Sequence, residues 1–302
     1  MLIKNHNILI LGSSGMLGNA VAYELITNSS HNLFLHSRTG LKTKEKILEK
    51  NPERIITEIK FDLYDNLLED IFKDYMNQYS IDLVINCIGL IKQKNEDYEA
   101  NIYLNASFPH FLRRICNLFN AKLIHVSTDC VFTNSVDHEY SEIDKPNAQD
   151  IYGISKRLGE LNNEKSLTLR TSIIGHELTS NYSLLDWFLS QKKQVEGYKH
   201  AIFSGVTSLE FAKIILKIVC LPNIKGLYNV ASNPISKYDL LKLASSIYQK
   251  DIEIIENVSF TMRRVLDARK FNSEFDHNPK SWEVQLIELK NYYDDIKDGI
   301  QK

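Results

Sequence analysis

A tyrosine and a lysine four residues apart, Tyr152 and Lys156, stand in the stretch IYGISKRLGE and are suited to proton transfer. Residues at positions i and i+4 of a helix lie on one face, so the two side chains can act together. A phenol has an unperturbed pKa of about 10, and a nearby ammonium favours its ionised form. The pair is a candidate proton donor to a carbonyl oxygen. Tyr-x-x-x-Lys also occurs by chance, so the pair needs companions in the sequence.

A glycine loop near the start of the chain is the first companion. Ile8 to Leu11 reads as a strand, three glycines follow at a spacing of three, and Met16 to Asn28 reads as a helix. Such a turn directs backbone N–H groups and the positive helix end at a pyrophosphate. The alternative is an ordinary strand-to-helix turn. We expect a dinucleotide cofactor to contact Gly12, Ser14, Gly15, Met16, Leu17 and Gly18.

The ends of the next strands supply further candidate cofactor contacts. Strand two ends in His36, Ser37 and Arg38, and an arginine here can pair with the 2′-phosphate of NADP, so NADPH is favoured and NADH remains possible. Arg38 can also be an ordinary surface residue, and the acid that ends strand three can cap the next helix instead. The other residues expected along the cofactor are Asp62, Leu63, Cys87, Ile88 and Gly89.

Alternation of strand-like and helix-like segments indicates the fold class. The predicted strands beyond the first are Leu33–Leu35, Ile55–Phe61, Asp82–Cys87, Lys122–Ser127 and Leu167–Thr171. This pattern favours an α/β fold, a Rossmann-type doubly wound parallel sheet with a smaller C-terminal substrate lobe. We place the dinucleotide-binding domain at 1–171 and a mainly substrate-binding lobe at 172–302, from which some segments return to the sheet. Helices are predicted in that lobe at Tyr182–Leu189, Ser208–Leu221, Lys237–Lys250 and Trp282–Ile296.

Composition narrows the class of protein. The chain has 302 residues, 43% of them hydrophobic and 25% charged, with a net charge of −2, so nucleic acid and anionic membranes are not expected partners. Its apolar stretches are too short to span a bilayer and its start lacks a signal-peptide pattern, so a cytoplasmic protein is expected. Its 4 cysteines are widely spaced, which suggests neither a disulfide framework nor a zinc site, and no metal is expected.

Thr128 is the second companion of the Tyr–Lys pair. It stands in HVSTDC at the predicted end of strand five, where a hydroxyl can donate to a substrate oxygen that gains charge. A threonine at a strand end can also simply bond its own loop. Four stretches occur in a shared order: LGSSGMLG, VSTDCVF, YGISKRLGE and LRTSIIG. With them the chain resembles the extended short-chain dehydrogenase/reductase superfamily and, within it, the dTDP-4-dehydrorhamnose reductase-like group.

The resemblance implies a role for each matching residue. The glycines would cradle the pyrophosphate, and Lys156 would bind the nicotinamide ribose and tune Tyr152. Tyr152 would protonate the new alkoxide while Thr128 holds the substrate oxygen. Asn105, in a segment similar to the family's fourth helix, would support the site through backbone or water contacts. A purely structural amide is an equal alternative for Asn105.

The segment after LRTS departs from the family pattern. Ile173, Ile174 and Gly175 stand where the family usually has aromatic residues near the sugar, so an altered sugar pocket is expected. Candidate substrate contacts are His176, Trp187, Phe188 and Gly205, although the aromatics can be core and His176 a loop residue. A guanidinium suits a diphosphate, and of the adjacent Arg263 and Arg264 only one is expected to reach it. We assign Arg263 to that role.

These features together predict an NADPH-dependent reductase of a 4-keto-6-deoxy nucleotide sugar, linked to dTDP or UDP, in deoxysugar and surface polysaccharide synthesis. A homodimer is possible. One alternative is an epimerase or dehydratase of the same superfamily, although a dehydratase commonly has an acid pair after the threonine and here Cys130 follows Asp129. A second alternative is a non-catalytic NADP-binding regulatory subunit.

Overall fold

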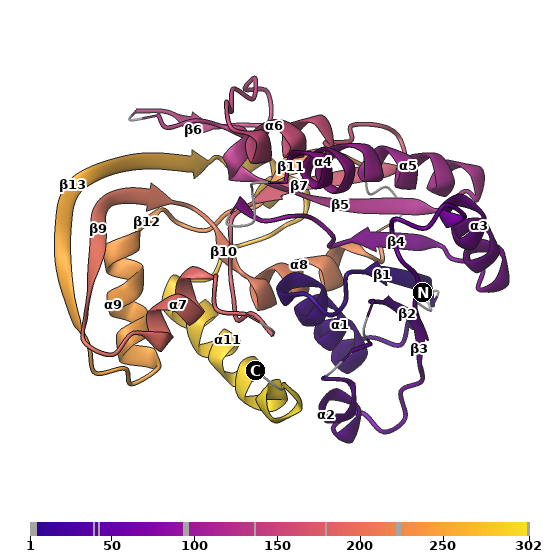
Figure 1. Cartoon of the computed structure of the whole chain (residues 1–302), viewed down its shortest axis with the longest axis horizontal. Coiled ribbons are helices and arrows are strands. Elements are labelled where there is room, and N and C mark those ends of the chain that lie inside the picture. Colours follow the sequence, from indigo (N-terminus) through magenta and orange to yellow (C-terminus); the bar gives the residue numbers. More distant parts are fainter. Residues whose placement is uncertain are drawn as a thin grey trace.

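The computed structural model describes residues 5–38, 40–41, 43–92, 97–135, 137–178, 180–221 and 225–300. Its centre is a seven-stranded parallel sheet in the order β11-β7-β5-β4-β1-β2-β3 (Figure 1). The strands are β1 Asn7–Leu11, β2 Asn32–His36, β3 Ile56–Ile59, β4 Leu83–Asn86, β5 Lys122–Thr128, β7 Ser166–Thr171 and β11 Gly226–Asn229. The Rossmann-type α/β fold expected from the sequence is confirmed.

Both faces of the sheet are buried because successive side chains of a strand point to opposite sides. In β1, Ile8 and Ile10 join one apolar core while Leu9 and Leu11 join the other. Helices α1 Met16–Asn28, α2 Lys44–Glu49 and α8 Ser208–Ile218 supply residues to the first core. Helices α3 Leu68–Gln78 and α5 Phe108–Leu118 cover the second, and α4 Tyr98–Asn101 and α6 Ile151–Leu158 follow on that side.

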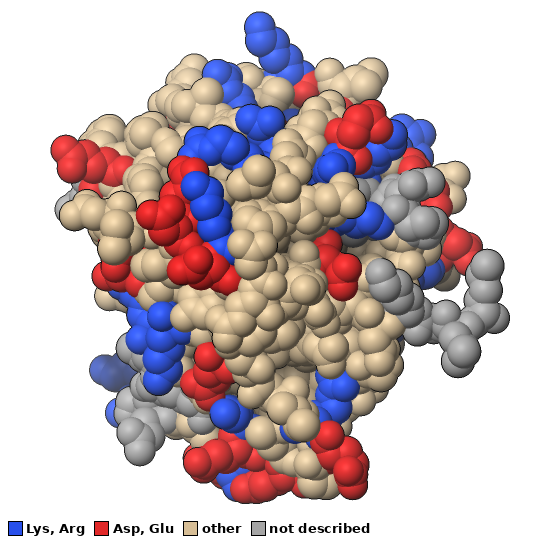
Figure 2. All heavy atoms as spheres, turned by 90° about the vertical axis from the view of Figure 1, so that its right-hand side faces the viewer, with Lys and Arg blue, Asp and Glu red and all other residues tan. Residues whose placement is uncertain are grey.

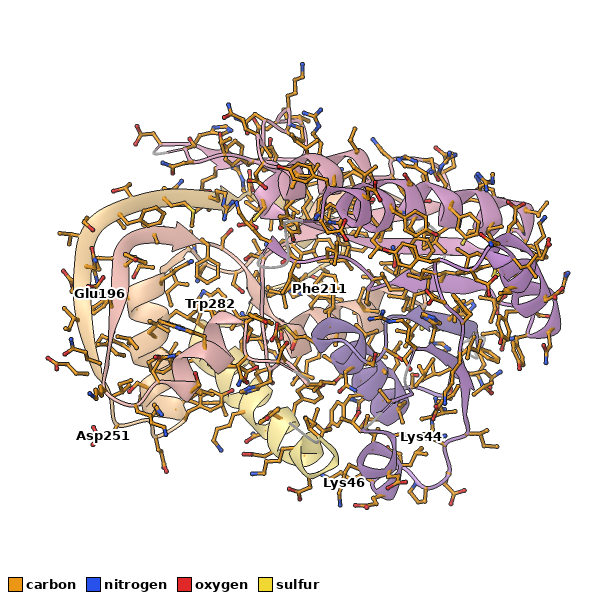
Figure 3. All side chains as sticks on the ribbon, viewed as in Figure 1. Lys44, Lys46, Glu196, Phe211, Asp251 and Trp282 are labelled. Atoms are coloured by element: carbon orange, nitrogen blue, oxygen red, sulfur yellow. The ribbon has the colours of Figure 1, made fainter. Side chains whose placement is uncertain are left out.

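The C-terminal part contributes to the sheet and also builds a lobe of its own. Its β11 extends the parallel sheet, and α8 packs against α1. The lobe holds α7 Leu184–Ser190, α9 Lys237–Ile247 and α11 Trp282–Ile296, whereas α10 Arg269–Glu274 packs against β11 at the edge of the parallel sheet. Phe211 of α8 and Trp282 of α11 are buried inside the molecule. Lys44, Lys46, Glu196 and Asp251 lie at its periphery (Figure 3).

Two long strands in this lobe were not predicted. β9 Gln194–Phe203 and β13 Glu253–Leu266 pair in parallel and form the curved arm on the left of Figure 1. Short strands complete the smaller sheets: β6 Glu139–Tyr140, β8 Ile173–Ile174, β10 Val206–Thr207 and β12 Ile235–Ser236. The arm escaped prediction because β13 is largely exposed and carries a register shift between Asn257 and Thr261, which breaks the alternation that marks a strand.

The described residues show neither a surface of one charge nor a long apolar helix. On the face turned to the viewer in Figure 2, lysines and arginines are interspersed with acidic side chains and neither sign dominates. No helix in the described part of the chain is long and apolar enough to cross a membrane. The same residues contain no group of three or more His, Cys, Asp or Glu side chains arranged to hold a metal ion.

Candidate active site

The glycine loop packs tightly between β1 and α1. Gly12 has a φ of +77°, which favours glycine, and a Cβ there would meet Ile88 Cγ1 at 2.9 Å. A Cβ on Gly18 would lie 2.2 Å from the Gly12 carbonyl oxygen, so the helix starts directly against the turn. Gly15 occupies the N-cap position and has no side chain to cap α1. The backbone N–H groups of the first turn are therefore available to a phosphate.

The second strand ends beside this loop. Both the backbone N–H and the hydroxyl of Ser13 donate to the His36 carbonyl oxygen, at 3.0 and 2.9 Å. Arg38 lies two residues farther on, exposed, and its charge lowers the pKa of the buried His36. Burial is the larger cause of that lowering. A cation thus stands next to the glycine loop, where a ribose phosphate of the cofactor is expected.

The third strand leads to a local turn. Asp62 accepts the backbone N–H of Tyr64 at 3.0 Å, so the carboxylate stabilises its own turn and does not cap α3. Leu63 is buried, and its carbonyl oxygen accepts the hydroxyl of Tyr103. These contacts fix the chain at the sheet edge where an adenine is expected.

The loop after β4 is tied to the catalytic helix through Asn105. The side-chain oxygen of this fully buried asparagine accepts the Leu90 N–H at 2.9 Å, and its amide donates to the Ser155 hydroxyl of α6 at 3.4 Å. It lies in a π-helical turn at 102–107, a distortion that often occurs at functional sites. Asn105 therefore holds the loop 87–90 through a contact with its backbone, and its role in the site stays a prediction. A Cβ on Gly89 would lie 3.0 Å from Asn105 Oδ1 and 3.5 Å from Lys156 Nζ.

Thr128, Tyr152 and Lys156 come together at the carboxyl edge of the sheet. Asp150 caps α6 by accepting the Gly153 N–H at 3.0 Å, which starts the helix two residues before the tyrosine. The Thr128 hydroxyl donates to Asp129 Oδ1 at 3.1 Å and lies close enough to the Tyr152 hydroxyl to lower its pKa. Lys156 Nζ donates to the Val126 carbonyl oxygen at 2.7 Å. Thr128 and Lys156 are buried, and Tyr152 is half-buried. The two hydroxyls can hold one substrate oxygen between them.

Burial controls the ionisation of this site. It raises the pKa of Tyr152 above its usual value, against a smaller lowering by the Thr128 hydrogen bond. Burial also lowers the pKa of Lys156 to about 8, although Glu160 and Cys87 oppose that shift. The expected lowering of the Tyr152 pKa by Lys156 is not found, and the cation that lowers it is Arg264. The ammonium of Lys156 is instead directed at the Val126 carbonyl.

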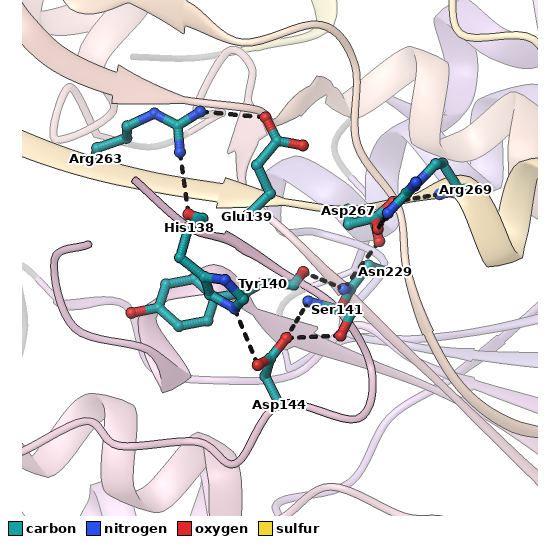
Figure 4. A network of polar contacts seen from close by, with 9 residues as sticks. All are labelled: His138, Glu139, Tyr140, Ser141, Asp144, Asn229, Arg263, Asp267 and Arg269. Atoms are coloured by element: carbon teal, nitrogen blue, oxygen red, sulfur yellow. Dashed lines mark hydrogen bonds and ion pairs between the residues drawn. The ribbon is translucent and has the colours of Figure 1, made fainter. Parts of the chain in front are cut away.

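Arg263 and Arg264 lie on opposite faces of β13 because strand side chains alternate. The Arg263 guanidinium donates to the His138 carbonyl oxygen at 3.0 Å and pairs with Glu139 at 3.2 Å, as Figure 4 shows. Arg264 faces the other way, with its Nε 3.7 Å from Asp129 Oδ2, next to Thr128. That Nε is buried and makes no hydrogen bond within the described residues. The structure thus places Arg264 beside Asp129 in the candidate site, whereas the predicted Arg263 is paired with Glu139.

Lys237 is a second cation of the C-terminal lobe at this place. It is the first residue of α9, and its pKa is lowered by burial and by Arg264 while Asp129 opposes that effect. A lysine at the positive end of a helix is unfavourable without an anion nearby. No sequence pattern had singled out Lys237, since it reads as an ordinary charge at a helix start.

The other predicted substrate contacts lie within the C-terminal lobe. His176 is buried, with its ring nitrogens 2.8 Å from Asp186 Oδ1 and 2.8 Å from the Tyr248 hydroxyl. Trp187 is 38% exposed on α7, and Phe188 is fully buried in the core. A Cβ on Gly205 would lie 2.2 Å from the Ser172 carbonyl oxygen, which requires glycine for packing. The contacts described for these residues do not join them to Tyr152.

A family model described as RmlD substrate binding domain matches residues 6–295. The chain belongs to the RmlD substrate binding domain family. A relative from Aggregatibacter actinomycetemcomitans, named dTDP-4-dehydrorhamnose reductase, is 22% identical over 94% of this chain and 98% of its own length.

Solved structures of sugar-nucleotide enzymes share the fold of this chain. A dTDP-4-dehydrorhamnose reductase from Bacillus anthracis in complex with NADP aligns with a TM-score of 0.74 at 19% identity, covering 95% of this chain and 99% of its own. A UDP-Glc/GlcNAc 4-epimerase from Campylobacter jejuni aligns with a TM-score of 0.78 at 16% identity, covering 97% and 100%. At these identities the structural likeness shows the fold shared by the RmlD family and related sugar-nucleotide enzymes.

Proposed function

We propose that this RmlD-family protein is an NADPH-dependent reductase of a 4-keto-6-deoxy nucleotide sugar, which supplies a deoxysugar for surface polysaccharide. The observation that carries the proposal is the meeting of two hydroxyls, Thr128 at the end of β5 and Tyr152 on α6, with Lys156 one helical turn from the tyrosine. Two hydroxyls at one point suit a carbonyl oxygen that becomes an alkoxide. The names of the family relatives support a sugar-nucleotide substrate.

The reaction divides between the cofactor and the chain. When bound, NADPH would supply a hydride to C4 of the sugar, so that the C4–O double bond would become a single bond. Tyr152 donates its proton to the oxygen, Thr128 donates a hydrogen bond to it, and solvent later returns a proton to the tyrosinate. Because burial keeps Tyr152 protonated, it can act as the acid at neutral pH. Lys156 holds the nicotinamide ribose in this scheme.

We assign the phosphate nearest the sugar to Arg264 and Lys237. Both cations lie at Asp129, directly after the residue that holds the reacting oxygen. Arg264 Nε has a hydrogen bond still to give, and a buried unsatisfied donor is costly until a ligand accepts from it. A doubly charged diphosphate offers such an acceptor. The Arg263 guanidinium already donates to His138 and Glu139, so Arg263 is the weaker candidate for binding the diphosphate.

The sugar itself is proposed from the residues after β7. Ile174 belongs to the core, and the partly buried Ile173 packs against that core, in the segment where the family usually places aromatics. A less planar apolar wall favours a bulkier substituent, so a UDP-linked 2-acetamido-2,6-dideoxy-4-keto hexose stands beside the dTDP-linked rhamnose precursor as a substrate.

Oxidation of NADPH with a panel of 4-keto sugar nucleotides tests the function, with kcat/KM for the two named substrates measured side by side. Turnover that requires a keto sugar supports the reductase. Product formed without net NADPH oxidation points to an epimerase or dehydratase. Tight NADPH binding without turnover, together with a stoichiometric partner in a pull-down, points to a regulatory subunit. A clear preference for the dTDP-linked substrate contradicts the altered sugar pocket and leaves the reductase function standing.

We also propose a cytoplasmic homodimer. The described structure holds free thiols at Cys87, Cys116, Cys130 and Cys220, as is usual in a reducing compartment where NADPH is kept reduced. Light scattering coupled to size-exclusion chromatography measures the mass in solution. A mass near one chain, 34.9 kDa, contradicts the dimer.

A further inference from the structure

The face of α6 that carries Tyr152 and Lys156 continues for one more turn to Glu160. The spacing of four places all three side chains toward the sheet. Glu160 follows directly after the C-cap residue Gly159, whose backbone remains close to helical. The proposed chemistry makes no use of this carboxylate, although it is largely buried, with 11% of its side chain exposed.

Each of the three side chains contacts a different residue of β5. Lys156 Nζ donates to the Val126 carbonyl oxygen at 2.7 Å. The hydroxyl of Ser127 donates to Glu160 Oε1 at 2.8 Å. Thr128, the next residue, lies beside Tyr152 and lowers its pKa. Three consecutive residues of β5 thus meet side chains from three turns of this helix face, and the hydrogen bonds of Lys156 and Glu160 fix where the helix lies along the strand.

Arg170 of β7 completes the attachment from the neighbouring strand. It lies opposite Ser127 in the sheet and donates from Nε and Nη2 to the two oxygens of Glu160, both at 2.7 Å. Only 2% of Arg170 is exposed, and its guanidinium stacks on Phe132 at 5.0 Å. A buried ion pair seldom adds net stability compared with apolar residues, so its use here is better explained by the register it imposes.

The charged and titratable groups around Lys156 are few. Glu160 on its own helix and Cys87 at the end of β4 favour its charged form, and burial opposes them. His125 of β5 is buried and its pKa lies far below the usual value, so it is neutral. Asn105 on the π-helical turn is uncharged, and Arg170 lies behind Glu160. Among these groups, the Glu160 carboxylate, which is paired with Arg170, is the negative charge that acts on Lys156.

We propose that Glu160 is a positioning residue of this enzyme, given the proposed roles of Tyr152 and Lys156: it sets the register of α6 against β5 and supplies the negative charge that Lys156 faces. Without that charge, less remains to offset the lowering of the Lys156 pKa by burial. Lys156 then loses its proton at a lower pH. A neutral amine holds the cofactor ribose less firmly than an ammonium. The predicted signature is a change in the pH dependence of NADPH binding.

The test is the Kd of NADPH, measured by its fluorescence from pH 6 to 10, for the wild type, Glu160→Gln and Ser127→Ala. In the wild type, affinity falls about two- to tenfold as pH rises through the pKa of Lys156, near 8. In Glu160→Gln the midpoint of this fall moves down by roughly 0.5 to 1 pH unit. Ser127→Ala is the matched control, because it removes a hydrogen bond to Glu160 and leaves the charge, so its midpoint stays at the wild-type value.

Glu160→Gln leaves Arg170 buried without its partner and can fail to fold. The double variant Glu160→Gln/Arg170→Met removes both charges of the pair. Glu160, and not Arg170, acts on the pKa of Lys156. The midpoint of the pH dependence of NADPH binding should therefore again move down. A Glu160→Gln or double variant that loses affinity by one constant factor at every pH would overturn the proposal. The proposal on Glu160 is also overturned if the wild type binds NADPH with an affinity that shows no midpoint between pH 6 and 10. If the wild type does not bind NADPH at all, the proposed function itself is contradicted.

Discussion

In the proposed mechanism Tyr152 is a proton donor, and its surroundings keep it protonated. Burial raises the pKa of the phenol, and the nearby Asp129 adds to that effect. The phenol therefore stays protonated at neutral and mildly alkaline pH, and we expect a loss of activity on the alkaline side to come from another group first. Lys156, with a pKa of about 8, is that group in the proposed site. Its contribution is present below this pH and is lost as the pH rises through it.

Tyr152→Phe removes the hydroxyl and keeps the ring. Turnover should fall by about 10²- to 10⁴-fold, because general acid catalysis is lost, while the Kd of NADPH changes little. Steady-state kinetics and NADPH fluorescence measure the two quantities. Tyr23→Phe is the control, because that hydroxyl bonds to Asp295 on the far side of the first core. Near-normal turnover of Tyr152→Phe would exclude it as the acid.

Arg38→Ala distinguishes the two cofactors. The charge next to the glycine loop can act on a 2′-phosphate that only NADPH carries, so NADPH binding should weaken about ten- to 150-fold, and NADH binding much less. Kd values for both cofactors give the ratio. Lys46→Ala removes a cation of the neighbouring α2 that already pairs with Glu49, and should change neither value. Equal losses for the two cofactors would make Arg38 an ordinary surface residue.

Arg264→Met and Arg263→Met form a matched pair on adjacent residues of one strand. We expect Arg264→Met to raise the KM for the nucleotide sugar about ten- to 150-fold, since a charge-assisted contact is lost. Arg263→Met should leave KM near the wild-type value, because its guanidinium is engaged with His138 and Glu139. The reverse result would return the diphosphate to Arg263.

Among the elements, the contact between α6 and the π-helical turn is the tightest one described near the site. A Cβ on Gly159 would lie 2.0 Å from the Asn105 carbonyl oxygen and 3.2 Å from Pro109 Cγ. The turn that carries Asn105 and the helix that carries Tyr152 therefore touch backbone to backbone. Only glycine allows this approach, which brings the Leu90 loop close to Lys156.

Gly159→Ala should therefore destabilise the fold by about 1 to 3 kcal/mol through overpacking. The displaced Asn105 should also loosen the loop after β4, so NADPH affinity falls along with the free energy of unfolding. Denaturant titration and NADPH binding measure both effects. Leu158→Ala, at the adjacent and 48% exposed position, should change little. A Gly159→Ala variant as stable as the wild type would contradict the tight approach.

Helices and strands were predictable where their apolar residues follow a single regular spacing. Met16–Asn28 and Trp282–Ile296 were placed with the bounds that the structure has, and the strands of the parallel sheet were found as apolar runs. The arm β9–β13 was missed because its residues alternate only in part and many are exposed. For the same reason the sequence could not decide between Arg263 and Arg264, because the face each occupies depends on how the arm is placed.

The local motifs of the site were readable, but the contacts between them were not. Thr128, Tyr152 and Lys156 stand in short recognisable stretches, and the structure joins them. The bonds of Glu160 to Ser127 and Arg170 join residues up to 33 positions apart, and no local pattern specifies such pairs. Lys237 likewise reaches the site only because α9 begins there.

At the scale of the whole molecule, the two parts of the chain share one core. Ile8 and Ile10 of β1 belong to the same apolar cluster as Leu286, Leu289 and Ile296 of α11. The hydroxyl of Tyr292 donates to Asn19 Oδ1 of α1 at 2.6 Å, and both side chains are buried. The helix that follows the glycine loop is therefore held in place by the C-terminal helix.

Leu289→Ala tests this coupling. Loss of a fully buried leucine should cost about 2 to 5 kcal/mol, whereas Ile287→Ala on the 43% exposed side of the same helix should cost little. Thermal unfolding can be followed by the fluorescence of Trp187 and Trp282, both C-terminal, and by release of NADPH. The two transitions should coincide and move down together. A tryptophan transition that moves while NADPH release does not would show two independent units.

The attachment of α11 to α1 has a consequence for biosynthesis. Because translation runs from the N-terminus to the C-terminus, the glycine loop leaves the ribosome before α11, and the helix that the loop opens gains its buried partner Tyr292 only when α11 follows. We expect a nascent chain that stops before α11 to leave this face of α1 exposed to chaperones and to be unable to retain NADPH. Capture of the proposed cofactor would then wait for α11, even though the glycine loop is translated before it.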